Sequence, residues 1–127
     1  MKPLASPKYT VERTYHFDAA HRLPQLPSGH KCHHLHGHTY KVEVAFTGDP
    51  NVLGFVIDYA DIDRLVDPVI RALDHKYLND IMPDTTAEYL AKYIFESVAR
   101  HKPLSIAATV TRVRLWETAR SCVEYGF

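Results

Sequence analysis

The chain lacks an excess of charge of either sign, because Lys and Arg together number 15 and so do Asp and Glu. A balanced chain does not predict a nucleic-acid or anionic-membrane partner, which would call for a basic surface. No apolar run approaches membrane-spanning length, and the first residues, Met1 to Pro7, contain no hydrophobic signal region. Two cysteines, Cys32 and Cys122, are too few for a secreted disulfide framework. We therefore expect a cytoplasmic protein.

Histidine is the residue type in unusual supply, with nine in a chain of 127 residues. Several of them lie between His16 and His38. The length suits one domain over residues 1–127, and we expect residues 1–8 to form a flexible tail. Internal repeats and low-complexity segments are absent from the sequence, so the fold is expected to be a single packed unit.

Alternation of apolar and polar residues predicts four strands, two before residue 50 and two at the end of the chain. They are expected at Tyr9–Phe17, Gly37–Thr47, Ala107–Trp116 and Cys122–Tyr125.

Two helices are expected between these pairs of strands. The first follows Asp58 and places apolar residues at helical spacing up to Leu73, although Pro68 should cost it a hydrogen bond or introduce a kink. The second begins at Thr85-Thr86-Ala87-Glu88, which fits a capping box, and ends at Lys102-Pro103.

The order strand, strand, helix, helix, strand, strand predicts an α+β domain. Its sheet should be four-stranded and mostly antiparallel, with both helices on one face. Such an open sheet has two exposed edges, which are prone to association. A homo-oligomer is therefore plausible on physical grounds.

The segment Cys32-His33-His34-Leu35-His36-Gly37-His38 carries the main chemical signal. If His36 and His38 begin a strand, both imidazoles point to the same face. His21 would complete a three-histidine site with an open position, which is typical of catalytic zinc, and no CxxC pair supports a structural zinc finger. The alternatives are a polar loop with solvated histidines, or another divalent ion such as copper, iron or nickel.

Cys32 precedes the histidine pair in a loop that also contains Lys31. A nearby cation or metal would favour its thiolate, which acts as base, nucleophile or ligand. Three interpretations stay open: a catalytic thiol, a fourth metal ligand that would close the site, and an inert residue.

Asp74 and His75 are a candidate acid–base unit, in which the carboxylate orients the imidazole. Adjacent residues of a helix do not face each other, so this pairing needs a non-helical backbone. The alternative is that both residues simply end the first helix.

Glu117 follows the third predicted strand with the parity of its apolar face. It is either a solvated strand terminus or a buried anchor. As an anchor it would accept two parallel N–H bonds from a guanidine-like edge, such as that of an aminopyrimidinone ring.

Taken together, these residues resemble the 6-pyruvoyl-tetrahydropterin synthase superfamily, and within it the bacterial 6-carboxy-5,6,7,8-tetrahydropterin synthase branch. The spacing CxxxHGH is the specific feature. The matching segments run in family order through nearly the whole chain: Phe17 to Leu23, Gly29 to Cys32, His36 to His38, Leu73 to Asn79, Thr85 to Ala91 and Trp116 to Thr118.

The resemblance implies roles for the candidate residues. His21, His36 and His38 would be zinc ligands, and Glu117 would anchor the pterin. The catalytic residues would be Cys32, Asp74 and His75.

The resemblance also implies the tunnelling fold, whose subunit sheets join edge to edge in a trimer or hexamer with active sites between subunits. The implied enzyme is a zinc-dependent carbon–carbon lyase that converts 7,8-dihydroneopterin triphosphate to 6-carboxy-5,6,7,8-tetrahydropterin, acetaldehyde and triphosphate. Its product feeds 7-deazaguanine and queuosine synthesis.

Two other functions stay open, namely a 6-pyruvoyl-tetrahydropterin synthase and a non-catalytic zinc-binding pterin module. His33 and His34 are departures that could compete for metal or protons. Arg22 and Lys31 are either triphosphate contacts or solvated cations.

Overall fold

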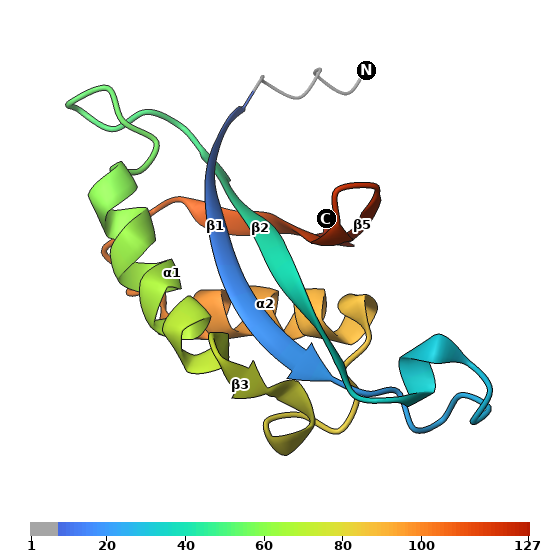
Figure 1. Ribbon diagram of the computed structural model, residues 1–127. Helices are drawn as coiled ribbons and strands as arrows, with labels where there is room; N and C mark the ends of the chain where they lie inside the picture. The colour runs from blue at the N-terminus through green and yellow to red at the C-terminus, as the bar shows by residue number, and fades with distance from the viewer. Residues whose placement is uncertain (1–7) are drawn as a thin grey trace.

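The structure is a computed structural model and describes residues 8–127, so most of the tail expected at residues 1–8 lies outside the described residues. Two long strands, β1 (Tyr9–His21) and β2 (His36–Gly48), pair antiparallel along their whole length. They form the long hairpin at the centre of Figure 1. β4 (Thr109–Thr118) pairs antiparallel with β2, and β5 (Ser121–Gly126) pairs antiparallel with β4.

The sheet has five strands in the order β3-β1-β2-β4-β5, which corrects the expected four-stranded sheet. The added strand, β3 (Lys76–Tyr77), has two residues and pairs parallel with Ala19 and Ala20 of β1. The sheet is therefore mixed, and the element order is ββαβαββ. A strand of two residues is too short to show an alternating pattern in the sequence. It forms because it pairs with β1, and local strand preference does not predict it.

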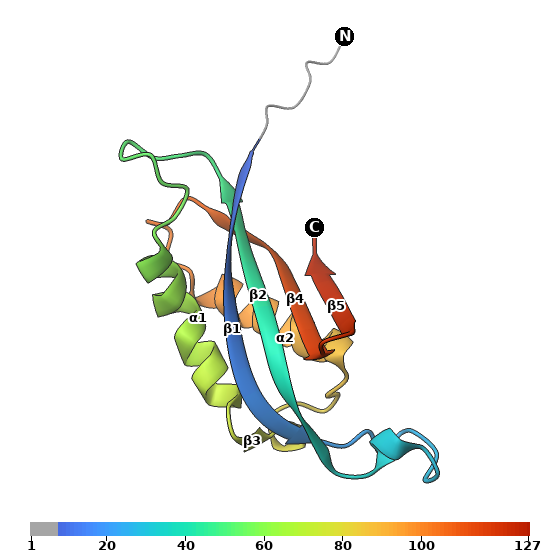
Figure 2. The same ribbon diagram turned by 45° about the horizontal axis from the view of Figure 1, so that its top comes forward.

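Both helices lie on one face of the sheet, as predicted (Figure 2). α1 (Tyr59–Leu73) is continuous through Pro68, which lies on its exposed side. Water can solvate the carbonyl that Pro68 leaves without a donor, so the helix continues.

α2 (Ala87–His101) begins one residue later than the expected capping box, because Thr86 is the N-cap and accepts from the Tyr89 amide. Thr85 is buried instead.

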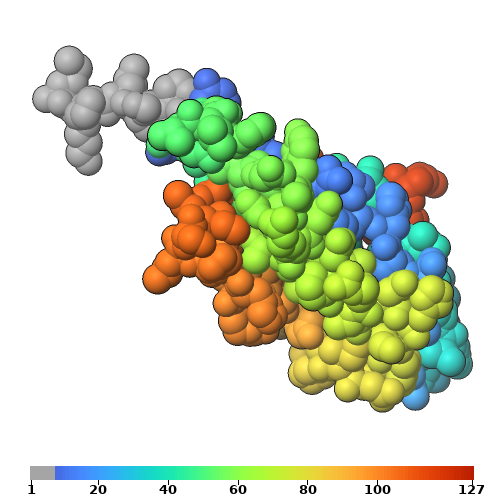
Figure 3. All heavy atoms as spheres, turned by 90° about the vertical axis from the view of Figure 1, so that its left-hand side faces the viewer, coloured from blue at the N-terminus to red at the C-terminus, as the bar shows by residue number. Residues whose placement is uncertain are grey.

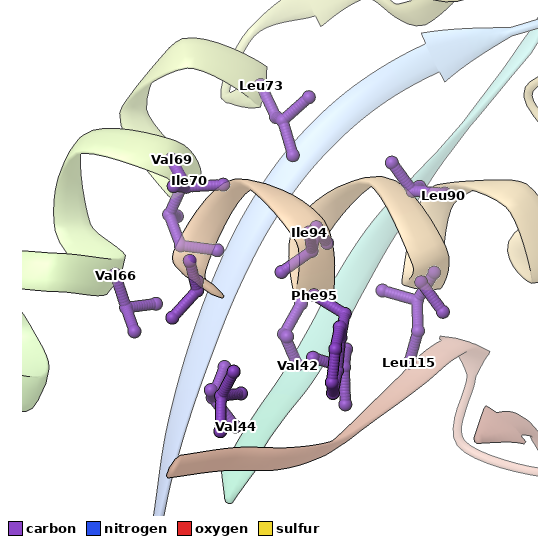
Figure 4. Close-up of a cluster of buried hydrophobic side chains, with 14 of the residues drawn as sticks. Val42, Val44, Val66, Val69, Ile70, Leu73, Leu90, Ile94, Phe95 and Leu115 are labelled. Atoms are coloured by element: carbon purple, nitrogen blue, oxygen red, sulfur yellow. The ribbon is translucent and has the colours of Figure 1, made fainter. Parts of the chain in front are cut away.

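The hydrophobic core fills the space between this face and the two helices (Figure 4). Alternate residues of β2, from Tyr40 to Phe46, are fully buried, and the inward faces of α1 and α2 cover them. Core side chains that Figure 4 labels come from both helices and from β2 and β4: Val42, Val44, Val66, Val69, Ile70, Leu73, Leu90, Ile94, Phe95 and Leu115. The same face of β1 and β2 continues past this core to the candidate site.

Two short 3-10 helices lie near the end of the hairpin where β1 ends and β2 begins. η1 (Lys31–His33) belongs to the connection between β1 and β2, and η2 (Leu78–Asp80) directly follows β3. Figure 3 shows the segment after α1, in yellow-green to yellow, against the blue to cyan residues of this end. Segments from three parts of the sequence thus meet where the histidines lie.

Candidate metal centre and adjacent pocket

The structure brings His21, His36 and His38 together. One ring nitrogen from each lies within 4.8 Å of the others. His21 and His36 are directly opposite in the β1–β2 ladder, and His38 follows on the same face of β2. The ring centroid of His21 lies 4.6 Å from that of His36 and 5.3 Å from that of His38. The hairpin register therefore assembles the cluster from residues that are distant in the sequence.

Hydrogen bonds from the Nδ1 atoms of His21 and His36 fix the orientation of these two rings. Nδ1–H of His21 donates to the Thr85 carbonyl at 2.8 Å, and Nδ1–H of His36 donates to the His34 carbonyl at 2.7 Å. These bonds leave Nε2 as the nitrogen with a free lone pair. Backbone carbonyls commonly orient metal-binding histidines in this way.

The Nε2 atoms of all three histidines are buried and have no hydrogen-bond partner among the described residues. His21 is only 1% exposed. Burial lowers the pKa of His21 and of His38 below the ordinary histidine value, so both rings favour the neutral form. Three convergent imidazoles with buried, unpartnered Nε2 atoms fit a divalent metal ion such as zinc.

Tyr40 and Phe17 form an apolar floor beneath the cluster. Tyr40 is fully buried, stacks on Phe17 at 4.9 Å between ring centroids, and lies 5.4 Å from the His38 ring. Burial also raises the pKa of the Tyr40 hydroxyl, which keeps it neutral. The histidine cluster therefore borders a low-dielectric core that strengthens electrostatic interactions at the site.

Glu117 lies beside this cluster and is not a solvated strand terminus. The ladder between β4 and β5 shifts register between Trp116 and Thr118, so Glu117 is the extra residue of a β-bulge. Its Oε2 lies 3.0 Å from Nε2 of His38, outside hydrogen-bond geometry, and its side chain is 27% exposed. The cluster thus has a carboxylate at its edge.

Cys32 lies in η1 and is half-buried. Its amide donates to Nδ1 of His30 at 3.0 Å, and its carbonyl accepts from the Leu23 amide at 2.8 Å. The thiol is not among the groups that converge within 4.8 Å of the three histidine nitrogens. Within this chain, the geometry gives no support to Cys32 as a fourth ligand.

His33 and His34 do not join the cluster either. Their ring nitrogens lie 2.8 Å and 3.0 Å from the carbonyls of Leu26 and Ser28 in the same loop. Both imidazoles therefore stabilise the loop that carries Cys32.

Asp74 and His75 form a pair at the edge of the sheet. Asp74 is the C-cap of α1, and its Oδ2 lies 3.1 Å from Nδ1 of His75. His75 has φ of +59°, the one positive φ of a non-glycine residue in the described part of the chain. This non-helical backbone lets the two neighbours face each other, which the acid–base interpretation requires.

The pair borders the pocket next to the histidine cluster. The volume of this pocket is about 570 Å³, and its lining includes Asp18, His38, Thr39 and His75. Hydrogen bonding from the Asp18 amide lowers the pKa of Asp74, which favours its carboxylate form.

Asp18 is a polar residue of this pocket that the sequence did not single out. Its position opposite Asp74 depends on the two-residue strand β3, which has no sequence signal.

Arg22 and Lys31 flank the site without an ion pair in the structure of residues 8–127. The backbone of Arg22 is held by Asn79, whose side-chain amide both donates to it and accepts from it. The Nε atom of Arg22 is buried without a partner, and Lys31 is exposed.

No helix in residues 8–127 is long and apolar enough to cross a membrane.

The chain is similar to proteins of one known family. The family described as 6-pyruvoyl tetrahydropterin synthase matches residues 10–126. The chain is 33% identical over 146 residues to 6-carboxy-5,6,7,8-tetrahydropterin synthase of Haemophilus influenzae, covering 92% of this chain and 98% of the relative. It is 36% identical over 101 residues to dihydroneopterin monophosphate aldolase of Pyrococcus furiosus, covering 80% and 82%.

A solved structure with a similar fold is that of 6-pyruvoyl tetrahydropterin synthase from Caenorhabditis elegans. The TM-score is 0.83 at 27% identity, and the match covers 98% of this chain and 99% of that one.

Proposed function

The chain belongs to the 6-pyruvoyl tetrahydropterin synthase family, and from this premise we propose that it is a zinc-dependent carbon–carbon lyase. The proposed reaction converts 7,8-dihydroneopterin triphosphate and water to 6-carboxy-5,6,7,8-tetrahydropterin, acetaldehyde and triphosphate, in 7-deazaguanine and queuosine synthesis. The observation that carries the proposal is the convergence of three buried, unpartnered Nε2 atoms beside a pocket whose lining includes His38. The 33% identity to a protein named for this product supports the choice within the family.

His21, His36 and His38 would hold the metal through Nε2. When bound there, zinc supplies Lewis-acid polarisation of substrate oxygens. The protein's own contribution is of two kinds. Burial keeps the rings of His21 and His38 neutral, and the carbonyls of Thr85 and His34 fix the rings of His21 and His36.

Glu117 is the proposed pterin anchor. A carboxylate accepts two parallel N–H bonds from the guanidine-like edge of an aminopyrimidinone. The bulge at Glu117 aims this side chain toward His38, which would hold the ring beside the metal ligands. Replacing Glu117 by Gln removes one acceptor and adds a donor, so KM should rise more than kcat falls.

The proton transfers are assigned to Cys32 and to the Asp74–His75 pair. The Cys32 thiolate would remove one proton, and His75, held by Asp74, would supply or remove the other. Cys32 belongs to the loop at residues 22–35, and the pair belongs to the sheet edge next to β1. We propose that a homo-oligomer, a trimer or hexamer, completes active sites between subunits, because the sheet has two open edges in the single chain.

Aldol cleavage of a dihydroneopterin phosphate is the second candidate. It is favoured by the 36% identity to dihydroneopterin monophosphate aldolase, which differs in the phosphorylation of its named substrate. A 6-pyruvoyl-tetrahydropterin synthase and a non-catalytic zinc-binding module are further alternatives.

Product analysis separates these functions. Zinc-loaded protein is incubated with 7,8-dihydroneopterin triphosphate and, separately, with the monophosphate, and products are identified by mass spectrometry. Carboxytetrahydropterin with acetaldehyde from the triphosphate is the expected result. A pyruvoyl product, cleavage of the monophosphate alone, or bound zinc with unchanged substrates would each replace the proposal with the corresponding alternative.

A further inference from the structure

Asp18 lies on β1 three residues before the metal-ligand candidate His21, but on the opposite face of the strand. Its carboxylate accepts a hydrogen bond of 2.5 Å from the hydroxyl of Thr39, its direct neighbour on β2. One of its oxygens also lies within 4.8 Å of an Asp74 oxygen and of a His75 ring nitrogen. Two carboxylates therefore face a single imidazole.

The backbone of Asp18 holds the same pair of residues. Its N–H donates to Oδ1 of Asp74 at 2.9 Å, and its carbonyl accepts from the His75 N–H at 2.6 Å. A left-handed backbone at a non-glycine residue is unfavourable unless its surroundings hold it. The two bonds to β1 hold His75 in that conformation, with its ring toward the pocket.

Negatively charged groups outnumber positively charged groups around His75. Asp74 faces it from the end of α1 and Asp18 from β1, whereas the cation Lys76 of β3 and the ring of His38 of β2, which favours the neutral form, line the same pocket. Nearby carboxylates accept hydrogen bonds from imidazole N–H groups and restrict the orientation of the ring. Thr39 has one proton to donate and gives it to Asp18, which keeps that carboxylate an acceptor directed into the cluster.

We propose that Asp18 and Thr39 are positioning residues for the Asp74–His75 pair, with the Asp18 carboxylate acting as a second anionic partner of the His75 ring. This inference rests on the proposed function for the role of the pair in proton transfer, whereas the positioning itself is independent of the substrate. Asp18 acts on His75, and Thr39 acts on Asp18. The strength of the effect should follow that order.

Four variants test the proposal in zinc-loaded protein. Asp18→Asn removes the charge but keeps the shape, and Thr39→Val removes the hydroxyl. Thr39→Ser restores a donor. Thr47→Val is the matched control, because the Thr47 hydroxyl on the same strand pairs with the hydroxyls of Thr10 and Thr111 rather than with a carboxylate.

Kinetics provide one readout. Asp18→Asn should lower kcat about tenfold while KM stays within about twofold, because the pair acts in the chemical step. Thr39→Val should lower kcat by a smaller factor, Thr39→Ser should restore it, and Thr47→Val should leave it unchanged. The zinc content of all four variants should equal that of the parent protein.

NMR of the His75 ring is the second readout and needs no substrate. The ring signals are assigned by comparison with His75→Gln. Asp18→Asn should shift the ring ¹⁵N and ¹H signals of His75, because the ring loses an anionic neighbour that lies within 4.8 Å of its nitrogen. Thr47→Val should leave these signals in place.

These readouts separate the inference from the proposed function. If the parent protein turns over neither pterin phosphate, shifted His75 ring signals in Asp18→Asn still support the positioning role, and unchanged signals overturn it. A fall in kcat that comes with zinc loss or a lower melting temperature also overturns it. If Asp18→Asn does not fold, the contrast between Thr39→Val and Thr39→Ser decides the question.

Discussion

Two clusters of titratable side chains each include a residue of β1, and they differ in burial and in hydrogen bonding. His21, His36 and His38 point to the helix-covered face, where Nε2 atoms are buried and without partners. Asp18, Asp74 and His75 lie at the sheet edge, where the His75 side chain is 78% exposed and its neighbours bond one another.

The difference assigns distinct chemistry to similar residue types. Imidazoles whose Nε2 atoms are buried and unpartnered are suited to a metal ion, since an unpaired buried polar atom is unfavourable by about 1–3 kcal/mol. An exposed imidazole between carboxylates can exchange protons with solvent and is suited to acid–base work. Each of the following predictions tests one side of this comparison.

The largest effect is expected when the buried cluster loses a ligand. His38→Ala should abolish stoichiometric zinc binding and reduce kcat/KM at least about 10³-fold, because the Lewis acid contributes several kcal/mol to transition-state stabilisation. Metal analysis by mass spectrometry measures the first quantity, and steady-state kinetics measure the second. His34→Ala is the control for zinc content, since its ring bonds a loop carbonyl and lies outside the cluster. Full zinc content in His38→Ala would contradict the proposed ligand set.

The next effect concerns Cys32, which belongs to neither cluster. Cys32→Ala should retain zinc and lose about 10²–10⁴-fold in kcat, the usual contribution of a general acid or base. Cys122→Ala, at an exposed strand residue, should behave like the parent protein. Zinc loss in Cys32→Ala would instead identify the thiol as a ligand.

A third substitution tests the exposed cluster. His75→Asn should reduce kcat about 10²-fold or more while the free energy of unfolding stays within about 1 kcal/mol, because Asn tolerates the left-handed backbone. Urea unfolding and steady-state kinetics give the two quantities. His16→Asn, at an exposed residue of β1, is the control. A large loss of stability would show that the His75 ring is mainly structural.

The smallest effect is a pH dependence of stability at Asp74. Its folded-state pKa lies below the ordinary value of 3.8, so its ionised form contributes stability above that pH. This contribution should disappear as the pH falls below 3.8 and through the folded-state pKa. Urea unfolding of the parent protein and of Asp74→Asn should therefore differ slightly at pH 6 and converge near the acid end. A gap that widens on acidification would contradict the sign of this shift.

The sequence was sufficient to predict the histidine cluster and most of the elements. Long alternating or helical patterns identify β1, β2, β4 and both helices, because each of these elements buries one face. The cluster follows from the hairpin, since β1 ends at His21, β2 begins at His36, and the two residues are opposite each other. The catalytic roles of Cys32, Asp74 and His75, and the anchoring role of Glu117, stay predictions.

Other features depend on contacts that no local pattern encodes. β1 continues past Phe17 to His21 although Asp18, Ala19 and Ala20 are weak strand formers, because β2 and β3 pair with that segment. The position of Asp18 opposite Asp74 and the bulge at Glu117 arise in the same way, from tertiary pairing.

The loop at residues 22–35 has a consequence for how such a protein can be altered. Its two ends are His21 and His36, which the ladder holds opposite each other, while Cys32 lies within the loop. Doubling a loop of this kind changes the free energy of closure by only about 0.6 kcal/mol. A change in loop length would therefore move the thiol while the imidazoles keep their positions. Variants with grafted or resized loops would place Cys32 differently relative to the same three histidines, and their reaction products could be compared.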